Sequence, residues 1–244
     1  ERLARDLAAR IAERDLRRIT ADLILANREL AVQRQRMEEE QVQVLNAMVR
    51  ALETKDPYTA GHTDRVAAIS VRIGYELGLD PDALERIRVG ALLHDIGKIG
   101  VRDNVLLKPD RLTAEEFEYI KRHTTLGDEL LSGIEQFRCV LPVIRHHHEK
   151  LDGSGYPDGL SGDDIPIEVR VVSVADVLDA LTSTRPYRDA TSADVAFTIM
   201  KSMEGHHLDP AIIAVARRIH KDGRLDDLLQ FNVGSEPARE DAAQ

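Results

Sequence analysis

Hydrophobic residues repeat at every seventh position through the first part of the chain, where neither Gly nor Pro occurs before Pro57. The repeat is formed by Leu16, Leu23, Leu30, Met37 and Val44. Ile19, Ala26 and Ala47 fill part of the companion stripe, which polar residues interrupt elsewhere. This spacing favours helices that pack along one seam. We expect residues 1–54 to be one long helix in a two-stranded parallel coiled coil; the alternative is an amphipathic helix lying on the main domain.

The pattern changes at Asp56-Pro57, where proline ends the first helix. Apolar residues then recur with helical spacing at 62–78, 82–94, 114–131, 135–148, 166–184, 192–204 and 210–221. Residues 170–174 have the composition of a strand, but their apolar continuation to Leu181 favours a helix. Residues 151–166 are rich in Gly and Pro, so we expect a loop. The sequence therefore predicts an all-α fold, a multi-helix bundle preceded by a long coiled-coil helix.

Three helix starts carry capping signals. Thr113-Ala114-Glu115-Glu116 resembles a capping box, and Asp80-Pro81 and Asp209-Pro210 each place proline after an N-cap residue. The length of 244 residues, 43% of them hydrophobic, suffices for one core and an appendage. The expected parts are a signalling and dimerisation helix at 1–54, the main domain at 55–233 and a disordered tail at 234–244.

The formal net charge of −10 is unevenly distributed along the chain. Residues 1–50 contain ten Arg and nine Asp or Glu, which gives +1, so residues 51–244 carry −11. An acidic main domain argues against a long nucleic acid as ligand, because it lacks a broad basic surface for phosphates. It does not exclude a small phosphate ester, because bound divalent cations would reverse the sign of the local field.

The single cysteine, Cys139, excludes an internal disulfide and any cysteine-based zinc site. No apolar stretch is long enough to span a bilayer and no signal peptide is visible, so we expect a cytoplasmic protein. The chain begins with Glu1 inside the heptad pattern. We therefore expect a fragment whose upstream part, a sensory or receiver domain, is missing.

Histidines cluster with acids at two places, His94-Asp95 and His146-His147-His148-Glu149. Adjacent imidazoles suit a core poorly, because each needs a polar partner, and a divalent metal rewards their clustering. The candidate ligands are His62, His94, Asp95, His123, His147, His148 and Asp176. Seven donors exceed the needs of one tetrahedral ion, so two ions that share a carboxylate fit better. Mixed imidazole and carboxylate favours Fe, Mn or Zn.

Each candidate also has an ordinary interpretation. A lone His94-Asp95 pair would be a surface feature, and Asp176 could make a hydrogen bond in the core. His62 and His123 could be exposed, so both depend on the whole set for support. We expect His146 to be exposed or to support a ligand. Asp179 lies three residues after Asp176 on the same helix face, so it is a candidate to support that ligand.

Cationic and aromatic groups suited to a nucleotide lie beside the candidate ligands. Lys98 follows the first cluster, and Arg185-Pro186-Tyr187-Arg188 follows the helix that carries Asp176. Arginine forks match phosphate geometry, and aromatic rings stack on bases. We take Lys98, Arg185, Tyr187 and Arg188 as candidate substrate contacts, with ordinary surface charge as the alternative.

The motifs together resemble the HD-GYP family, a bacterial branch of the HD-domain metal-dependent phosphohydrolases. The matches are Gly61-His62 before Arg65-Val66-Ala67, His94-Asp95-Ile96-Gly97-Lys98, His147-His148-Glu149, Asp152-Gly153-Ser154-Gly155-Tyr156-Pro157, Ser173-Val174-Ala175-Asp176 and Arg185-Pro186-Tyr187-Arg188. The resemblance implies an HD-type helical bundle that hydrolyses cyclic di-GMP to pGpG, and often to GMP, with iron or manganese. Where some members carry a Glu that supports a third metal, this chain has Tyr58, so we predict two divalent ions.

The resemblance also implies residue roles. His62, His94, Asp95 and Asp176 would hold one ion, and Asp95, His123, His147 and His148 would hold the other, with Asp95 bridging. Lys98 would contact the scissile phosphate, which makes Asp95 and Lys98 the expected catalytic residues. Arg185 and Arg188 would hold other parts of the nucleotide. Gly155-Tyr156-Pro157 is similar to the family's docking element for diguanylate cyclase (GGDEF) domains.

Two other functions remain open at this stage. The chain could be a signalling module that senses nucleotide or docks partners without turnover, although a complete ligand set argues against lost activity. It could also be another HD-type phosphohydrolase, acting on a nucleoside phosphate or on a hybrid cyclic GMP-AMP dinucleotide. The Gly-Tyr-Pro loop argues against the general HD enzymes, and the hybrid dinucleotide is not excluded. In each case we expect a homodimer formed through the N-terminal helix.

Overall fold

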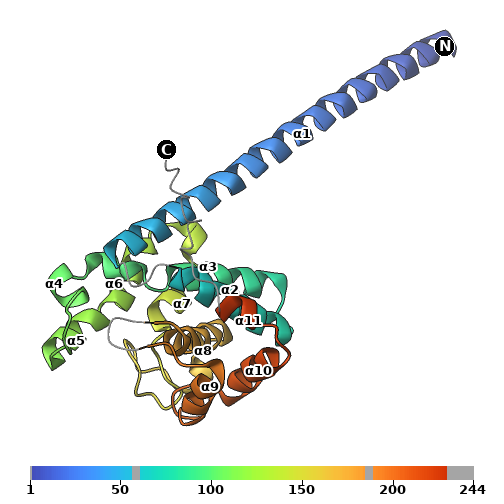
Figure 1. Ribbon diagram of the computed structural model, residues 1–244. Coiled ribbons are helices and arrows are strands. Elements are labelled where there is room, and N and C mark those ends of the chain that lie inside the picture. Colours follow the sequence, from blue (N-terminus) through green and yellow to red (C-terminus); the bar gives the residue numbers. More distant parts are fainter. Residues whose placement is uncertain (1, 57–60, 185–188, 230–244) are drawn as a thin grey trace, which may run out of the picture. The chain divides into compact units, whose positions relative to one another are not determined.

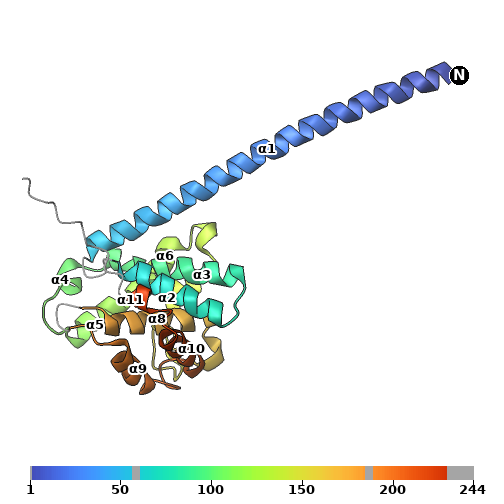
Figure 2. The same cartoon turned by 45° about the vertical axis from the view of Figure 1, so that its right-hand side comes forward.

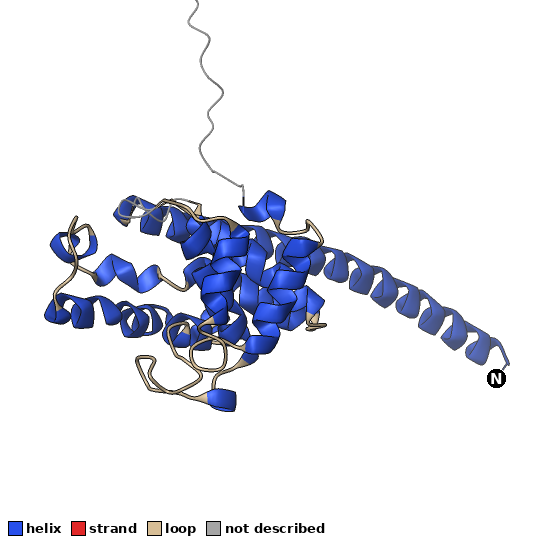
Figure 3. Ribbon diagram, turned by 60° about the horizontal axis from the view of Figure 1, so that its bottom comes forward, coloured by secondary structure: helices blue, strands red, loops and turns tan. Residues whose placement is uncertain are grey.

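The computed structural model describes residues 2–56, 61–184 and 189–229. The regular secondary structure in these ranges consists of α-helices and short 3₁₀ helices (Figure 3). The all-α prediction is therefore confirmed. The chain divides into two compact units, Glu1–Ala47 and Met48–Gln244, which are described separately. No helix of the described ranges has both the length and the apolar character needed to cross a bilayer.

Helix α1 (Arg2–Lys55) supplies the whole described part of the first unit and continues into the second. The prediction of one long helix is confirmed. Its heptad positions are exposed in the single chain: Leu16, Ile19, Leu23, Leu30, Met37 and Val44. Six exposed apolar side chains along one stripe are what a helical partner would cover, but pairing itself stays a prediction.

The second unit is a bundle of short helices (Figure 1). The α-helices are α2 (His62–Glu76), α3 (Pro81–Leu93), α4 (Asp103–Leu106), α5 (Ala114–Lys121), α6 (His123–Leu131), α7 (Leu141–His146), α8 (Ile167–Thr182), α9 (Ala193–Lys201), α10 (Pro210–Lys221) and α11 (Asp226–Leu229). The 3₁₀ turns are η2 (Ile96–Gly100), η3 (Glu135–Phe137) and η4 (Gly162–Asp164). The predicted helix starts are confirmed, because the Asp80, Thr113 and Asp209 side chains accept hydrogen bonds from the first turns of α3, α5 and α10.

Two predicted helices are wrong in length. Residues 114–131 form α5 and α6, with a break at Arg122, and residues 135–148 form η3 followed by α7. The break at Arg122 separates segments with different burial, because α5 has no fully buried residue whereas α6 buries four. The change of direction at Arg122 lets the first segment stay near the surface while the second packs into the core. The break makes His123 the first residue of α6.

Helix α8 forms the centre of the core. It contacts α2 and α3 on one side and α9 and α10 on the other (Figures 1 and 2). Its buried apolar residues include Val169, Val171, Val172, Val174 and Leu178. A helix that is apolar nearly all round must be enclosed by other elements, and burying each such side chain stabilises the fold by about 1.5–3 kcal/mol. The strand-like segment 170–174 is thus helical, as predicted. Asp176 lies on this enclosed helix.

Candidate metal centre

The structure brings all seven candidate ligands together. They come from the start of α2 (His62), the junction of α3 and η2 (His94, Asp95), the start of α6 (His123), the end of α7 (His147, His148) and the middle of α8 (Asp176). His148 and Asp176 are half-buried, and the other five are buried. Helix ends explain how neighbours such as His94 and Asp95 face one site, because helical geometry no longer turns them about 100° apart.

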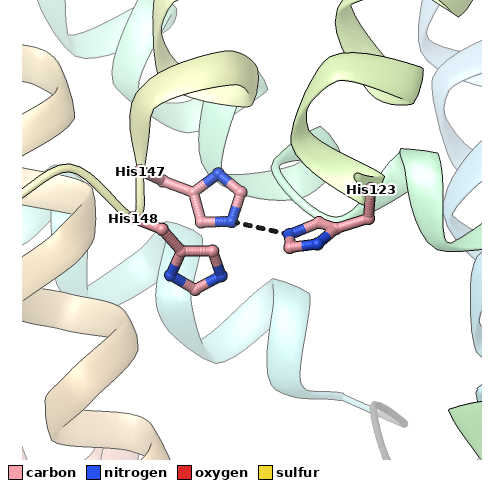
Figure 4. Close-up of side chains that lie close together, drawn as sticks. All are labelled: His123, His147 and His148. Carbon is pink, nitrogen blue, oxygen red and sulfur yellow. Dashed lines mark hydrogen bonds between the residues drawn. The ribbon is translucent and has the colours of Figure 1, made fainter. Parts of the chain in front are cut away.

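Three overlapping sets of ligand atoms form within this cluster, each with all its atoms within 4.8 Å of one another. The acid-paired group is His62, His94 and Asp176, and the imidazole group is His123, His147 and His148. The third set is His94, Asp95 and His147. In the imidazole group, the Nε2 atoms of His123 and His147 lie 3.3 Å apart and face each other (Figure 4).

Asp95 lies between the two groups and turns one carboxylate oxygen toward each. Its Oδ1 is 3.4 Å from Nε2 of His123 and 4.0 Å from Nε2 of His147. Its Oδ2 is 3.4 Å from Nε2 of His94. A carboxylate in this position can donate one oxygen to each of two cations.

Backbone carbonyls orient three of the histidines in the same way. The Nδ1 atom of each donates to the carbonyl oxygen three residues earlier: His94 to Ala91 at 2.6 Å, His123 to Ile120 at 2.7 Å and His147 to Ile144 at 3.0 Å. With Nδ1 donating, Nε2 keeps its lone pair for a cation. Such outer partners fix ring orientation and raise ligand basicity.

His62 is oriented by acids instead. Its Nδ1 lies 2.7 Å from Oδ2 of Asp179, and its Nε2 lies 3.3 Å from Oδ1 of Asp176. Arg65 donates from Nε to Oδ1 of Asp179 at 2.6 Å, which fixes that carboxylate. Burial favours the neutral ring, but the hydrogen bonds to Asp176 and Asp179 outweigh it and raise the pKa of His62 to about 9. Asp179 thus contacts the candidate ligand His62, as its position on the helix face of Asp176 led us to expect.

The remaining protonation states suit a cation. Burial, then the neighbouring charge of His123, lowers the pKa of His148 to about 4. Burial likewise holds the pKa of His147 well below its ordinary value. Burial opposes ionisation of Asp95, but Lys98 and then His94 bring the pKa of that carboxyl well below its usual range. Neutral imidazoles and ionised carboxylates are the forms that bind metals, so the residues present fit a divalent cation.

The cluster opens into a cavity of about 480 Å³. Besides five of the donors, its walls include Lys98, Asp56, Arg65 and Tyr156. Nζ of Lys98 lies 2.8 Å from Oδ2 of Asp95. Burial favours the neutral amine, but Asp95 and then Asp56 raise the pKa of Lys98 above its ordinary value. A fixed positive charge therefore stands beside the donor cluster.

The Gly155-Tyr156-Pro157 loop is built around Glu149, whose role the sequence analysis did not identify. The Glu149 carboxylate accepts backbone hydrogen bonds from Asp158, Gly159 and Leu160 at 2.7, 3.0 and 3.1 Å. A Cβ at position 155 would lie 2.4 Å from Cα of Glu149, so only glycine fits there. Glu149 directly follows the two candidate ligands His147 and His148, and this position is the sequence signal that could have linked the loop to the candidate site.

The same loop also reaches the cavity. The Tyr156 ring centroid lies 4.9 Å from that of His148, and Nζ of Lys121 lies 5.3 Å from the Tyr156 centroid. The half-buried His146 points to Asp158, with its Nε2 2.8 Å from Oδ2, so it supports this loop. Arg185, Tyr187 and Arg188, like Tyr58, lie outside the described residues.

The chain is similar to known proteins in both sequence and structure. Residues 46–212 match the model of the HD domain family. The chain is 42% identical over 179 residues to the cyclic di-GMP phosphodiesterase response regulator RpfG of Xanthomonas campestris, covering 72% of this chain and 47% of that protein. It is 37% identical over 175 residues to the 3'3'-cGAMP-specific phosphodiesterase 3 of Vibrio cholerae, covering 72% and 38%.

Among solved structures, the chain is similar to Bd1817, an HDG"Y"P protein from Bdellovibrio bacteriovorus, with a TM-score of 0.55 and 26% identity. That match covers 66% of this chain and 51% of the other. The chain spans less than half the length of the two curated relatives, at 47% and 38%. The family model spans residues 46–212, the region that carries the donor cluster.

Proposed function

The chain belongs to the HD domain family, and we propose that it is a metal-dependent phosphodiesterase that hydrolyses cyclic di-GMP to pGpG, and further to GMP, in bacterial second-messenger signalling. The family resemblance inferred from the motifs is thereby confirmed. The observation that carries the proposal is the convergence of seven buried or half-buried donors, with Asp95 between two groups, beside a cavity of about 480 Å³. Relatives named as cyclic dinucleotide phosphodiesterases support the choice of substrate.

Two divalent ions, iron or manganese, fit the donor set. One would be held by the acid-paired group with Asp95, and the other by the imidazole group with Asp95. Imidazole and carboxylate donors without sulfur favour these metals over softer or harder ions. When bound, such cations neutralise a phosphodiester and lower the pKa of water near them.

The chain's own residues then bind and orient the substrate. Lys98 lines the cavity beside Asp95, and its ammonium stabilises charge that develops on the phosphoryl oxygens. Only 18% of its side chain is exposed, which strengthens this effect because little water screens the charge. Arg185, Tyr187 and Arg188, which lie outside the described residues, would contact other parts of the nucleotide. Tyr156 offers an aromatic face at the cavity wall.

The hybrid cyclic GMP-AMP dinucleotide is the second candidate substrate. It is favoured by the 37% identity to a relative named for that specificity. Both substrates present the same phosphodiester linkage to the cluster, so the choice between them depends on base contacts. A module that binds nucleotide without turnover is the third possibility, and the complete donor set argues against it.

Further partners belong to the same proposal. The exposed stripe of α1, which includes Leu16, Leu23 and Leu30, would form a parallel homodimer. The Gly155-Tyr156-Pro157 loop would dock GGDEF domains. An upstream sensory or receiver domain would act through α1 in the cytoplasm. Analytical ultracentrifugation of the chain and of a form without residues 1–47 tests the dimer, which the shorter form should lose.

Product chromatography tests the activity. Protein purified without oxygen and loaded with Mn²⁺ should convert cyclic di-GMP to pGpG, and a chelator should abolish this conversion. Parallel incubation with 3'3'-cGAMP ranks the two substrates by kcat/KM. Faster hydrolysis of 3'3'-cGAMP would replace the first substrate by the second. No hydrolysis of either by protein that holds both ions would contradict the phosphodiesterase.

A further inference from the structure

Asp56 is a buried acid that faces the cavity outside the donor sets. It directly follows Lys55, the last residue of α1, and only 6% of it is exposed. No set of candidate ligands among the described residues includes it. Its Oδ2 lies 3.3 Å from Nζ of Lys98. The acid therefore acts on the one lysine that the proposed reaction uses.

Lys98 is held between two carboxylates that are not equivalent. Its Nζ lies 2.8 Å from Oδ2 of Asp95 and 3.3 Å from Oδ2 of Asp56. The same Oδ2 of Asp95 faces Nε2 of His94 at 3.4 Å, where the proposed cation of the acid-paired group would bind. An ammonium and a divalent cation repel each other and compete for that oxygen. Asp56 belongs to none of the candidate ligand sets among the described residues.

Asp56 is also firmly placed. Its backbone N–H donates to the carbonyl of Leu52 at 2.9 Å, and Leu52 is fully buried. One turn earlier, Oε1 of Glu53 accepts a hydrogen bond from the backbone N–H of Gly61 at 2.9 Å, next to the ligand His62. Lys55 forms an ion pair with Asp103. The segment that carries the Asp56 carboxylate is thus held to the second unit by a buried side chain, a hydrogen bond and an ion pair.

We infer that Asp56 is a positioning residue, which draws Lys98 away from Asp95 when a cation binds there and holds the ammonium toward the substrate phosphate. The inference rests on the proposed function for the phosphate contact. It does not rest on it for the competition at Asp95, which concerns only the lysine, the two acids and a cation. Without Asp56, Lys98 stays on Asp95 and opposes the cation.

A double-mutant cycle on cation affinity tests this role without any substrate. Mn²⁺ is titrated calorimetrically into chelator-treated wild type, Asp56→Asn, Lys98→Met and the double variant. Asp56→Asn should weaken Mn²⁺ binding by about tenfold, a coupling typical of groups in direct contact. In the Lys98→Met background the same change should have no effect, because no ammonium is left to compete. An equal loss in both backgrounds, or no loss in either, would overturn the inference.

Kinetics with cyclic di-GMP provide the second readout. With saturating Mn²⁺, Asp56→Asn should lower kcat by about tenfold, less than the 10²–10³-fold loss typical for a deleted charge-stabilising donor, and leave KM within about threefold. Asp56→Glu keeps the carboxylate and should recover most of kcat. Asp82→Asn is the control, because it removes an exposed acid from the first turn of α3 without touching Lys98 or the segment that carries Asp56, and it should behave as wild type.

The outcomes separate the two claims. An inactive wild type with the expected Mn²⁺ cycle would reject the proposed function and keep the pairing of Asp56 with Lys98. An active wild type with Asp56→Asn unchanged in kcat would reject the positioning role alone. Should Asp56→Asn fail to fold, Asp56→Glu replaces it in the cycle. Because this variant keeps the carboxylate, the inference then requires that it bind Mn²⁺ with wild-type affinity and that its kcat fall by less than tenfold.

Discussion

The acid-paired group and the imidazole group line the same cavity but are neutralised in opposite ways. In the acid-paired group, a proton on His62 compensates Asp176 and Asp179, so this ring is charged in the metal-free protein at neutral pH. In the imidazole group, burial keeps His147 and His148 uncharged. One group therefore holds a proton where a cation would bind, and the other is already in its binding form.

One donor cluster can therefore bind its two cations in two chemically distinct steps. A cation that enters the acid-paired group must displace a proton and keep two acids satisfied. A cation that enters the imidazole group gains neutral ligands at no protonation cost. Asp95, with one oxygen toward each group, is the element that connects the two steps.

Removing the shared carboxylate should have the largest effect, because it affects both groups at once. Asp95→Ala is expected to lose both cations and to lower turnover by roughly 10³-fold or more. Elemental analysis and product chromatography measure the two losses. Asp64→Ala removes an exposed acid from α2 and serves as the control, with wild-type values expected. Full metal content and activity in Asp95→Ala would contradict the shared role.

Single-ligand variants should separate the groups. His62→Ala removes a donor from the acid-paired group only, and His123→Ala removes one from the imidazole group only. Each variant should lose about half of the bound metal, because the other group keeps its donors. Elemental analysis of protein purified without oxygen gives the ratio of metal to protein. Complete loss in both variants would mean that the two groups bind only together.

A supporting residue should have a smaller effect on one group. Asp179→Asn weakens the acceptor that orients His62 and should lower the cation affinity of the acid-paired group by about tenfold. The imidazole group should keep its affinity. Glu168→Gln, which removes an ion pair with Arg86 elsewhere on α8, is the control. Calorimetric titration resolves the two affinities, and an equal change in both would show a general loss of packing.

Proton release should distinguish the groups at pH 7. His62, with a pKa of about 9, is protonated there and must release a proton to bind a cation through Nε2. His148, with a pKa of about 4, is already neutral. Titration of Mn²⁺ in buffers of different ionisation enthalpy should therefore show about one proton released by the acid-paired group and none by the imidazole group. The same release from both would remove the contrast.

The stability of the metal-free protein should show the same contrast with the smallest amplitude. The pKa of His62 is raised, so its contribution is complete below pH 6.5 and is lost as pH rises through about 9. The pKa of His148 is lowered, so stability falls as pH drops from 6.5 through about 4. Urea unfolding of chelator-treated protein across this range should give a maximum near neutral pH. A curve that still rises at pH 9 would contradict the charge assigned to His62.

The sequence predicted the elements whose signals are local. Caps at Asp80, Thr113 and Asp209 mark helix starts, and each was found. The long helix follows from a stretch without Gly or Pro. The seven donors were selected by residue type and motif spacing, and the structure brings them together. The position of Asp179 beside the cluster could be predicted because residues three apart on a helix share one face.

Features that depend on distant contacts were not predictable. Asp56 and Lys98 are 42 residues apart, and nothing local links them. The break at Arg122 depends on how α5 and α6 are buried by other elements. Glu149 looked like part of the histidine motif, yet its carboxylate organises backbone N–H groups nine to eleven residues later. Packing across the fold, rather than sequence spacing, decides such roles.

Anomalous X-ray diffraction from crystals of the Mn²⁺-loaded protein would locate the bound cations. We expect two anomalous peaks inside the cavity, one beside His62, His94 and Asp176 and one beside His123, His147 and His148, with Asp95 contacting both. Peaks only at the protein surface, or none in crystals grown with Mn²⁺, would contradict this expectation.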